Sequence, residues 1–284
     1  MKYTFLHISD LHYRSNWYEE SGLVCNKFIE DIKKQVKNHE NPYLIFSGDI
    51  VFSAASPGIY SEFETNFAKE LDSAGLPKDR RICVPGNHDV SQDSLKLLLT
   101  IQKGALDQMT SEQLFNEHLP QNSQTFLAPK FESYKAYESQ FAQYTSCASR
   151  LGGTGWALSD EIGVYCLNTA LCSFAGLTDL TGEVISDQNK LMIDTRSLHK
   201  WLRETDFKIR VLVMHHPLDW LNEWAKLELE KIISNSFQLI FSGHIHENST
   251  TFSTRGIGKS VHCVAPPLFT KKSELLGYSF IGSM

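Results

Sequence analysis

Five short apolar runs recur along the chain, and each has the length and composition of a buried β-strand. The runs cover residues 3–8, 43–46, 81–84, 211–214 and 237–241. Each run is followed by one of five polar groups, which are Asp10-Leu11-His12, Gly48-Asp49, Gly86-Asn87-His88-Asp89, His215-His216 and Gly243-His244-Ile245-His246. In open α/β sheets, ligands bind beyond the carboxyl ends of the strands. We therefore predict an α/β fold in which these polar groups, which are far apart in the sequence, meet at one edge.

The segment between the third and fourth polar groups has a different character. Residues 91 to about 150 are rich in Gln, Glu, Ser, Leu and Lys, and their apolar side chains recur at helical spacing. These side chains are Leu95, Leu98, Leu99, Phe131, Tyr134, Tyr137 and Phe141. Pro120 and Pro129 divide the segment into separate helices. We predict a helical insertion that either forms a lid or wall beside the polar groups or is a scaffold packed against the sheet edge.

The remaining segments complete one domain over residues 1–284. The flanks of the insertion, residues 1–90 and 158–270, suggest two β-α-β halves. The predicted later elements are a hairpin in residues 156–167, helices in 191–203 and 227–233, and strands in 261–264 and 275–281. The glycines of residues 152–155 predict a flexible exit from the insertion.

Because the sequence stops directly after the last strand, we hypothesise a module of a longer protein, with an additional domain or partner subunit.

Composition narrows the class of protein. With 42% hydrophobic and 21% charged residues, the chain has the balance of a soluble globular protein. No apolar run approaches the roughly 18 residues of a membrane span, and the amino terminus lacks the pattern of a secretory signal. We therefore expect a cytoplasmic protein without a membrane partner. The formal net charge is −6 and basic residues form no stripe, so a nucleic-acid partner is not favoured.

The six cysteines are scattered through the chain without a paired two-residue spacing. They are Cys25, Cys83, Cys147, Cys166, Cys172 and Cys263. Several lie in apolar strands, which favours buried free thiols over disulfides or a zinc site.

The polar groups carry metal-ligand chemistry. Asp10 and His12 lie two residues apart at a strand end, where side-chain direction repeats with period two, so they can hold one cation together. The same argument joins His244 and His246. Asp49 is the natural bridge between two divalent ions, because a carboxylate can share its oxygens whereas a neutral imidazole cannot share its single lone pair. Mixed oxygen and nitrogen ligands suit Mn²⁺, which we favour, as well as Fe or Zn²⁺, and they allow Ni²⁺ or Co²⁺.

Two such cations predict a hydrolytic reaction at phosphorus. Cations about 3.5–4 Å apart lower the pKa of a shared water toward ~7, and the resulting hydroxide can attack a phosphoester in line with its leaving group. His88 lies between Asn87, a neutral oxygen ligand, and the acidic Asp89. We predict that His88 faces the phosphate as a catalytic residue and that Asp89 orients and charges its imidazole.

The ordered set of groups resembles the calcineurin-like metallophosphoesterase superfamily, and its motifs span residues 10–246. The resemblance implies a four-layer β-sandwich of two mixed sheets flanked by helices, in place of one open sheet. It also implies catalysis by His88 and two metal sites that share Asp49. The implied ligands are Asp10, His12, Asp49 and His246 for the first metal, and Asp49, Asn87, His215 and His244 for the second. The sequence His216-Pro217 resembles the cyclic-nucleotide phosphodiesterase branch, although a rigid turn that positions His215 is an equal alternative.

These observations favour a dinuclear metal-dependent phosphodiesterase that acts on a small, nucleotide-type phosphodiester through a metal-bridging hydroxide. One alternative is a DNA or RNA nuclease of the same superfamily, which would need more basic positions than the chain offers. Another alternative is a non-catalytic sensor module of a larger assembly that binds metal and phosphate.

Overall fold

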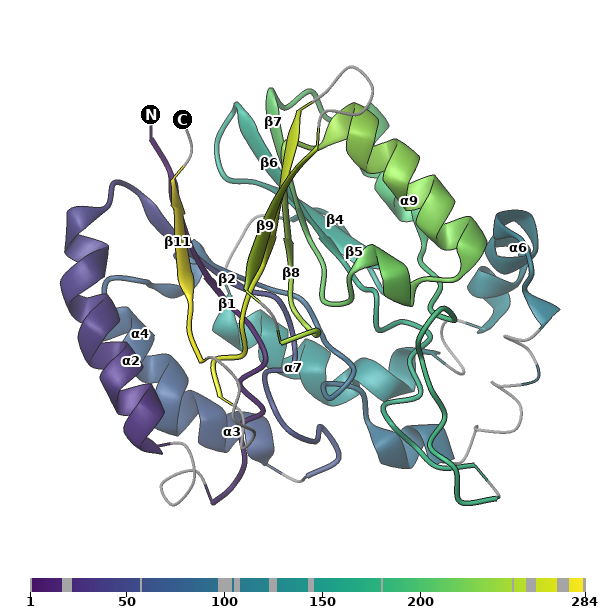
Figure 1. Cartoon of the computed structure of the whole chain (residues 1–284), viewed down its shortest axis with the longest axis horizontal. Coiled ribbons are helices and arrows are strands. Elements are labelled where there is room, and N and C mark those ends of the chain that lie inside the picture. The colour runs from purple at the N-terminus through teal and green to yellow at the C-terminus, as the bar shows by residue number, and fades with distance from the viewer. Residues whose placement is uncertain are drawn as a thin grey trace.

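Two β-sheets pack face to face between outer layers of helices in the computed structural model (Figure 1). The structure describes residues 2–16, 22–56, 58–96, 104, 108–122, 127–142, 146–179, 181–246, 248–253, 259–269 and 276–282, with the side chains of residues 120–122 and 146–150 left out. The two mixed sheets flanked by helices confirm the sandwich that the resemblance implied. The single open sheet suggested by the strand pattern alone is wrong, because the strands divide between two sheets.

The four-stranded sheet has the order β11-β1-β2-β3. Its strands are β1 (Thr4–Ile8), β2 (Pro42–Phe46), β3 (Arg81–Cys83) and β11 (Ser279–Gly282). The first three run parallel, and β11 pairs with β1 in the antiparallel direction. The outer face is covered by α2 (Gly22–Gln35), α3 (Ile59–Phe63) and α4 (Lys69–Ser73), and a π-helical turn (Glu64–Ala68) joins α3 to α4. Short 3-10 helices lie at Val36–Asn38 and Lys78–Arg80.

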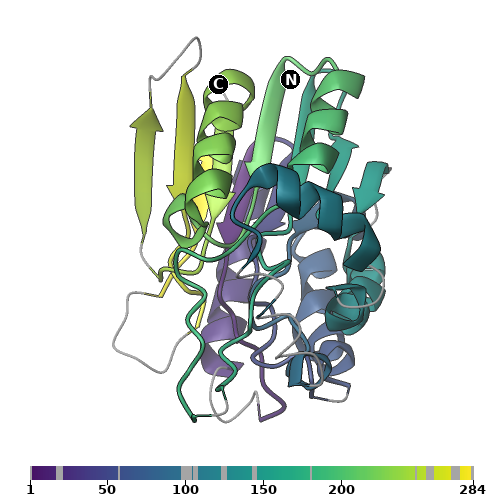
Figure 2. The ribbon, with the colours of Figure 1, turned by 90° about the vertical axis from the view of Figure 1, so that its right-hand side faces the viewer.

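The seven-stranded sheet has the order β4-β5-β6-β7-β8-β10-β9. Its strands are β4 (Ser146–Arg150), β5 (Gly153–Ala157), β6 (Ile162–Leu167), β7 (Ile209–Val213), β8 (Leu239–Ser242), β9 (Ser249–Ser253) and β10 (Ser260–Val264). Strands β6, β7, β8 and β10 run parallel. Figure 2 shows α8 (Thr195–Glu204) and α9 (Glu223–Ser236) side by side over this sheet, and a 3-10 helix (Leu218–Trp220) precedes α9.

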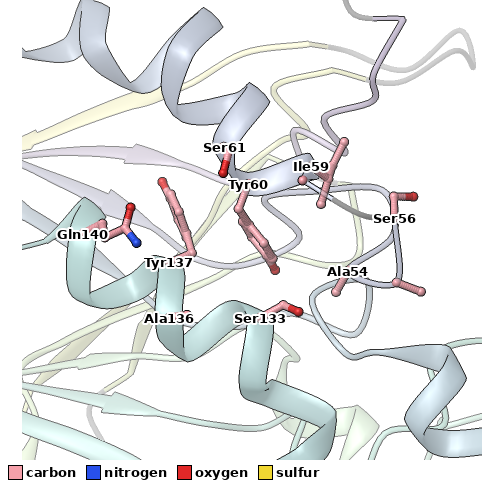
Figure 3. Close-up of a pocket in the computed structure, with 11 residues that line it drawn as sticks. Ala54, Ser56, Ile59, Tyr60, Ser61, Ser133, Ala136, Tyr137 and Gln140 are labelled. Carbon is pink, nitrogen blue, oxygen red and sulfur yellow. The ribbon is translucent and has the colours of Figure 1, made fainter.

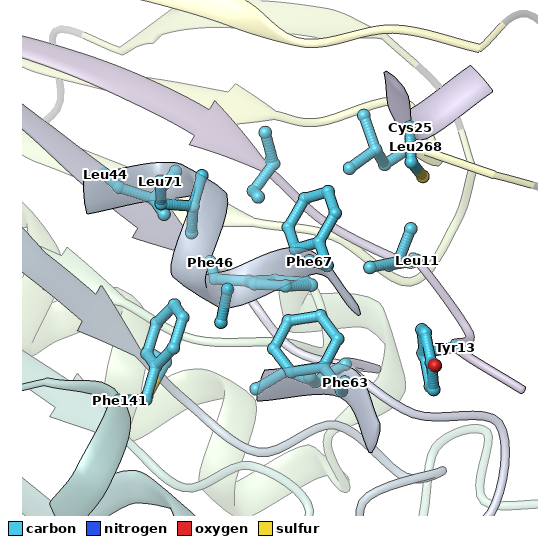
Figure 4. Packing of buried hydrophobic residues seen from close by; sticks show 14 of the residues in the cluster. Leu11, Tyr13, Cys25, Leu44, Phe46, Phe63, Phe67, Leu71, Phe141 and Leu268 are labelled. Atoms are coloured by element: carbon cyan, nitrogen blue, oxygen red, sulfur yellow. The ribbon is translucent and has the colours of Figure 1, made fainter. Parts of the chain in front are cut away.

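Among the described residues, three of the four hydrophobic cores hold these layers together. Alternate residues of a strand face opposite sides of its sheet, so Leu44 and Phe46 of β2 pack under the outer helices while Ile45 faces the other sheet. Figure 4 shows Phe46 among Phe63, Phe67 and Leu71 of the outer helical layer. A second core lies between the two sheets and includes Ile45 of β2 and Phe241 of β8. A third core lies between the seven-stranded sheet and helices α8 and α9. The strand ends are therefore fixed on both faces.

The described part of the insertion contains both helices and a strand. It includes the predicted helices, which are α6 (Glu112–Asn122), a 3-10 helix (Ala128–Phe131) and α7 (Glu132–Phe141), but the predicted division at Pro120 is wrong because Pro120 lies within α6. The helical prediction is wrong for residues 146–150, which form β4 and pair with β5 at the edge of the seven-stranded sheet. Leu98 and Leu99 lie outside the described residues.

The insertion packs into the domain as a scaffold. Tyr134, Tyr137 and Phe141 join the core under the four-stranded sheet. The buried Lys130 ammonium donates to the carbonyl oxygen of Leu171 at 2.9 Å, which ties the insertion to the loop after β6. Among the two alternatives for the insertion, this packing favours the scaffold.

The glycines at residues 152–155 have a packing role that sequence reasoning missed. Gly153 and Gly155 lie in strand β5, so the predicted flexible exit is wrong. A Cβ at Gly155 would lie 2.3 Å from Trp201, and one at Gly153 would lie 2.6 Å from the Tyr165 hydroxyl. The predicted hairpin of β5 and β6 is confirmed by their antiparallel pairing.

Two composition-based predictions can be compared with the structure. Free, buried thiols are found at Cys25, Cys83, Cys166, Cys172 and Cys263, as predicted, and the Cys147 side chain lies outside the description. Every helix of the described residues is too short or too polar to cross a bilayer.

Candidate metal centre

The five predicted polar groups meet where the two sheets present the carboxyl ends of their parallel strands. The loops that leave these ends are joined by backbone hydrogen bonds. Asp10 N–H donates to the Gly48 carbonyl at 3.1 Å, and His12 N–H donates to the Asp49 carbonyl at 3.0 Å. Across the other sheet, Gly243 N–H donates to the His215 carbonyl at 3.0 Å. The ligand-bearing loops therefore continue the strand ladders and hold their side chains in register.

Five of the predicted ligands have a left-handed backbone. Their φ angles are 52° for Asp10, 49° for His12, 53° for Asp49, 72° for His244 and 55° for His246. Such angles are uncommon outside glycine and concentrate at functional sites. Asp10 and His12 thus share a side because of two left-handed turns, and the period-two argument from an extended strand gives the wrong reason for their proximity.

Two glycines allow the ligands to approach the neighbouring backbone. A Cβ at Gly86 would lie 2.1 Å from Asp49 Oδ1, and a Cβ at Gly243 would lie 2.7 Å from Asp10 Oδ2. Any larger residue would displace the carboxylate. These glycines therefore belong to the site although they offer no ligand atom.

The first cluster of ligand atoms surrounds Asp10 Oδ1. The Nε2 atom of His246 lies 3.4 Å from it, and the Nε2 atom of His12 lies 3.9 Å from it. His12 Nε2 is also 3.9 Å from Asp49 Oδ2. No hydrogen-bond donor is aligned with the buried Asp10 Oδ1 among the described residues. A divalent cation fits this set of one buried carboxylate oxygen and two imidazole nitrogens.

The second cluster surrounds His215 Nε2. This nitrogen lies 3.2 Å from Asn87 Oδ1, 3.2 Å from His244 Nδ1 and 3.4 Å from Asp49 Oδ2. The Nδ1–H group of His215 donates to the Ser47 carbonyl at 2.7 Å, which fixes the tautomer and leaves Nε2 as the ligand nitrogen. Asp49 Oδ2 therefore faces both clusters, as a bridging ligand requires.

The carboxylates of the centre are held ionised. Asp10 Oδ2 accepts the His244 backbone N–H at 3.0 Å, and Asp49 Oδ1 accepts the His88 backbone N–H at 2.9 Å. Burial raises the pKa of Asp10, but the neighbouring His246 and His215 imidazoles lower it to about 2. Burial likewise opposes ionisation of Asp49, but His215 and His88 hold its pKa well below the usual value. Both carboxylates are therefore available to cations at neutral pH.

The imidazoles differ in their affinity for protons. Burial lowers the pKa of His12 to about 4, and burial together with His215 lowers that of His244 to about 3. Burial also lowers the pKa of His215, but Asp49 outweighs it and raises the value to about 9. His12 and His244 thus present lone pairs to a metal, whereas His215 must release a proton when a cation binds.

Comparison with known proteins assigns the chain to a family. A family model described as calcineurin-like phosphoesterase matches residues 3–248. The chain belongs to the calcineurin-like phosphoesterase family. Over 254 residues it is 26% identical to the uncharacterized metallophosphoesterase-like protein YydB of Bacillus subtilis (strain 168), a match that covers 88% of this chain and 50% of that protein. The chain therefore spans about half the length of this relative.

Solved structures that are similar to this chain include a putative 5'-nucleotidase from Staphylococcus aureus. The TM-score is 0.46 with 15% identity, over 94% of this chain and 49% of the other. The phosphopantetheinyl hydrolase of Mycobacterium tuberculosis gives a TM-score of 0.40 with 15% identity, over 94% and 90% of the respective chains.

His88 of this calcineurin-like phosphoesterase is oriented by a backbone group rather than by its sequence neighbour. Its Nδ1 atom lies 2.7 Å from the carbonyl oxygen of Phe52. The Asp89 carboxylate instead accepts the backbone N–H groups of Ile50, Val51 and Gly86 and the hydroxyl of Tyr60. The predicted orientation of His88 by Asp89 is therefore wrong, and Asp89 organises the two ligand loops. Burial and the nearby Asp49 raise the pKa of Asp89 to about 6.

His216 lies against the second cluster of this phosphoesterase. It is fully buried, and its Nδ1 atom lies 3.0 Å from the Thr169 hydroxyl. Its Nε2 atom has no aligned hydrogen-bond partner among the described residues. The ligand nitrogens of His215, His216 and His244 all lie within 4.8 Å of one another. His216 thus places a third imidazole beside those of His215 and His244. Neither of the two alternatives given for His216 in the sequence analysis predicted this position.

A pocket of about 250 Å³ separates the insertion from the loop that leads to α3 (Figure 3). Tyr60 and Tyr137 line it, and their rings stack with centroids 4.8 Å apart. Ala54 on the same wall donates its N–H to the His88 carbonyl at 3.1 Å. The insertion therefore supports the loops that carry Asp49 and His88, because Tyr137 of the insertion stacks on Tyr60, which donates its hydroxyl to Asp89. No periodic pattern in the sequence indicates Phe52 or Tyr60 as functional residues, because their roles depend on loop geometry.

Proposed function

We propose that this calcineurin-like phosphoesterase is a dinuclear metal-dependent phosphodiesterase that hydrolyses small, nucleotide-type phosphodiesters. The observation that carries the proposal is the position of Asp49, whose Oδ2 atom lies 3.9 Å from His12 Nε2 and 3.4 Å from His215 Nε2. One carboxylate between two ligand clusters is the arrangement that a two-metal hydrolase needs. The His215-His216-Pro217 turn, which resembles that of the cyclic-nucleotide phosphodiesterase branch, supports a diester substrate.

The residues would hold the two cations in the sets that the family resemblance implies. These sets are Asp10, His12, Asp49 and His246 for one cation, and Asp49, Asn87, His215 and His244 for the other. When bound, the cations supply an activated water as the nucleophile and stabilise the negative charge that develops on the phosphoryl oxygens.

His88 is the residue that transfers a proton. A carbonyl oxygen only accepts hydrogen bonds, so His88 Nδ1 carries the hydrogen that it shares with Phe52. The Nε2 atom is then the one that gains or loses a proton during the reaction. Protonated at Nε2, His88 donates to the oxygen of the leaving group, a contribution worth typically ~10²–10⁴-fold in rate.

The proposal is tested by hydrolysis of bis-p-nitrophenyl phosphate and p-nitrophenyl phosphate by Mn²⁺-loaded protein, with Asp49→Asn as the matched variant. We expect faster turnover of the diester by the wild type, and loss of both metal and turnover in Asp49→Asn. Circular dichroism of the variant controls for folding. Folded wild-type protein that binds two metal ions but hydrolyses neither ester would contradict the proposal, and a preference for the monoester would redirect it to phosphatases.

A further inference from the structure

The indole of Trp220 lies against the ring of His244, a predicted ligand of the second cation. The two ring centroids are 4.0 Å apart, and the ring planes meet at 83°. Such an edge-to-face arrangement is a favoured contact between aromatic rings. The His216 ring lies 4.5 Å from the His244 ring, also measured between centroids. The imidazole of His244 is therefore in contact with two rings from the turn that follows β7.

Contacts with the His244 ring matter because its ligand atom is Nδ1. This nitrogen lies 3.2 Å from His215 Nε2 in the second cluster. Nδ1 and the carbon Cδ2 are both bonded to Cγ, so a half turn about χ2 would exchange them and place a carbon at the cluster. The χ2 torsion of histidine is broad and does not select one orientation by itself. Neighbouring groups must therefore select the orientation in which Nδ1 faces the cation.

The position of Trp220 is set by a core outside the metal centre. Its backbone N–H donates to the Pro217 carbonyl at 3.0 Å, and its carbonyl oxygen accepts the N–H of Leu191 at 3.2 Å. Trp220 also packs against the core between the seven-stranded sheet and helices α8 and α9. Leu191 and Leu221 belong to that core and form an isolated β-bridge. These contacts hold Trp220 in place beside His244.

The two histidines of the second cluster are oriented by different means. A hydrogen bond from His215 Nδ1–H to the Ser47 carbonyl, 2.7 Å long, fixes both the rotation and the tautomer of that ring. For His244, the contact with Trp220 restricts the rotation of the ring. Trp220 makes its ring contacts with His216 and His244, so a change at position 220 should act on the second cluster and spare the first.

We infer that Trp220 is a positioning residue for the second cation, because its indole restricts the rotation of His244 and keeps Nδ1 directed at the metal. Trp220 offers no ligand atom itself and acts only through His244. The inference rests on the proposed function for the presence of two cations. Its consequence is that the occupancy of the second cation site depends on an aromatic side chain at position 220.

The first test measures metal affinity by calorimetric titration of the metal-free protein with Mn²⁺. Trp220→Leu removes the aromatic ring but keeps an apolar side chain, and Trp220→Phe keeps a ring. Trp224→Leu is the matched control, because Trp224 packs against the same core and donates its indole N–H to the Met109 carbonyl at 3.3 Å. We expect Trp220→Leu to bind one of the two ions about 10–100-fold more weakly. Trp220→Phe should recover most of this loss, and Trp224→Leu should match the wild type.

A reference variant assigns the weakened step to the second cluster. Asn87→Ala lacks a ligand of that cluster alone, so its titration shows which binding step belongs to the second cation. We expect Trp220→Leu to weaken the same step. Circular dichroism controls for folding, and Trp220→Met replaces Trp220→Leu if the latter does not fold.

The second test examines the geometry of the loaded centre. The visible absorption of bound Co²⁺ depends on the identity and arrangement of its ligands, and not on the stability of the fold. We expect Co²⁺-saturated Trp220→Leu to differ from the wild type in this absorption, whereas Trp224→Leu keeps the wild-type spectrum. A role in fold stability alone would lower the free energy of unfolding but change neither the metal affinity nor the spectrum of the folded protein.

The outcomes separate this inference from the proposed function. Equal affinities for the second ion in Trp220→Leu and Trp224→Leu would overturn the inference, and so would a loss confined to the step that Asn87→Ala leaves unchanged. Neither result requires turnover. A wild type that binds two ions and loses affinity for the second in Trp220→Leu, but hydrolyses no ester, would instead contradict the proposed function alone.

Discussion

The imidazole of His88 is held by the main chain of Phe52, whose carbonyl oxygen accepts the His88 Nδ1–H group across 2.7 Å. The alignment of His88 therefore depends on the path of the loop after Asp49 and not on the side chain at position 52. A substitution of the Phe52 side chain therefore leaves the carbonyl that orients His88, whereas a substitution of His88 removes the imidazole itself.

Replacement of His88 should slow the reaction without emptying the centre. We expect His88→Ala to lose ~10²–10⁴-fold in kcat, because the leaving oxygen no longer receives a proton from a positioned acid. The measurements are steady-state kinetics with bis-p-nitrophenyl phosphate and metal content by elemental analysis. The partly exposed His199 on α8 offers the control His199→Ala, which should keep the wild-type rate. A His88→Ala protein that has lost both metals would mean that the ring is structural.

Removal of the Tyr60 hydroxyl should destabilise the fold. Tyr60 donates to the buried Asp89 carboxylate at 2.9 Å, so Tyr60→Phe should lower the free energy of unfolding by about 1–3 kcal/mol. Urea denaturation of the metal-free protein gives the value. Tyr137→Phe is the matched control, because the Tyr137 hydroxyl is buried without an aligned partner among the described residues, and its loss should be neutral or stabilising. Equal destabilisation by the two variants would show that the Tyr60 hydrogen bond contributes nothing specific.

The stability of the metal-free protein should fall in weak acid. Burial lowers the pKa of His7 to about 3, so the unfolded chain takes up a proton at His7 below pH 6.5 while the folded chain does not. Stability from this residue is complete above pH 6.5 and is lost as the pH falls toward 3. The loss between pH 7 and pH 5 should be about 2 kcal/mol.

The contribution of His7 is measured as the difference between the wild type and His7→Gln in urea denaturation at the two pH values. The variant should be less stable at pH 7, because it changes the contact between His7 Nε2 and the Ser47 hydroxyl at 2.9 Å, but it should lose less on acidification. Identical pH dependence in both proteins would rule out His7 as the titrating group.

A methyl group at Gly86 should weaken metal binding. The new Cβ would lie 2.1 Å from Asp49 Oδ1, so the bridging carboxylate must move. We expect Gly86→Ala to bind Mn²⁺ at least about tenfold more weakly, the lower bound for loss of a residue that orients a ligand. Titration of the metal-free protein with Mn²⁺ provides the affinity. Gly282→Ala, where no atom lies within 4 Å of the added Cβ, is the control, and equal affinities in the two variants would contradict the role of Gly86.

The sequence predicted the strands and the identities of the clustered residues more accurately than their geometry. Apolar runs bounded by polar groups located the strands before Asp10, Asp49 and His215, because strand burial leaves a local pattern. The division of these strands between two sheets depends on long-range pairing, which no local pattern records. The orientation of Asp89 was missed for the same reason, since its partners Ile50 and Tyr60 lie 39 and 29 residues away.

The insertion shows where helical periodicity is insufficient. The spacing of Phe131, Tyr134 and Phe141 predicted a helical segment correctly. Residues 146–150 became a strand because the edge of β5 was open to pairing, and tertiary context overrides weak local preference. The burial of Lys130 and its hydrogen bond to the Leu171 carbonyl also depend on tertiary contacts, which helical spacing does not record.

A left-handed backbone lowers the stability of the fold at five positions whose side chains are needed for metal binding. These positions are Asp10, His12, Asp49, His244 and His246. Each such angle costs of order 1–3 kcal/mol, so the metal-free loops store conformational energy that a ligated cation can offset. Glycine adopts these angles without strain, and glycine at His12 or His246 would relax the loop and remove a ligand at the same time. Selection for thermostability alone would therefore erode the centre, and only selection for its chemistry maintains these side chains.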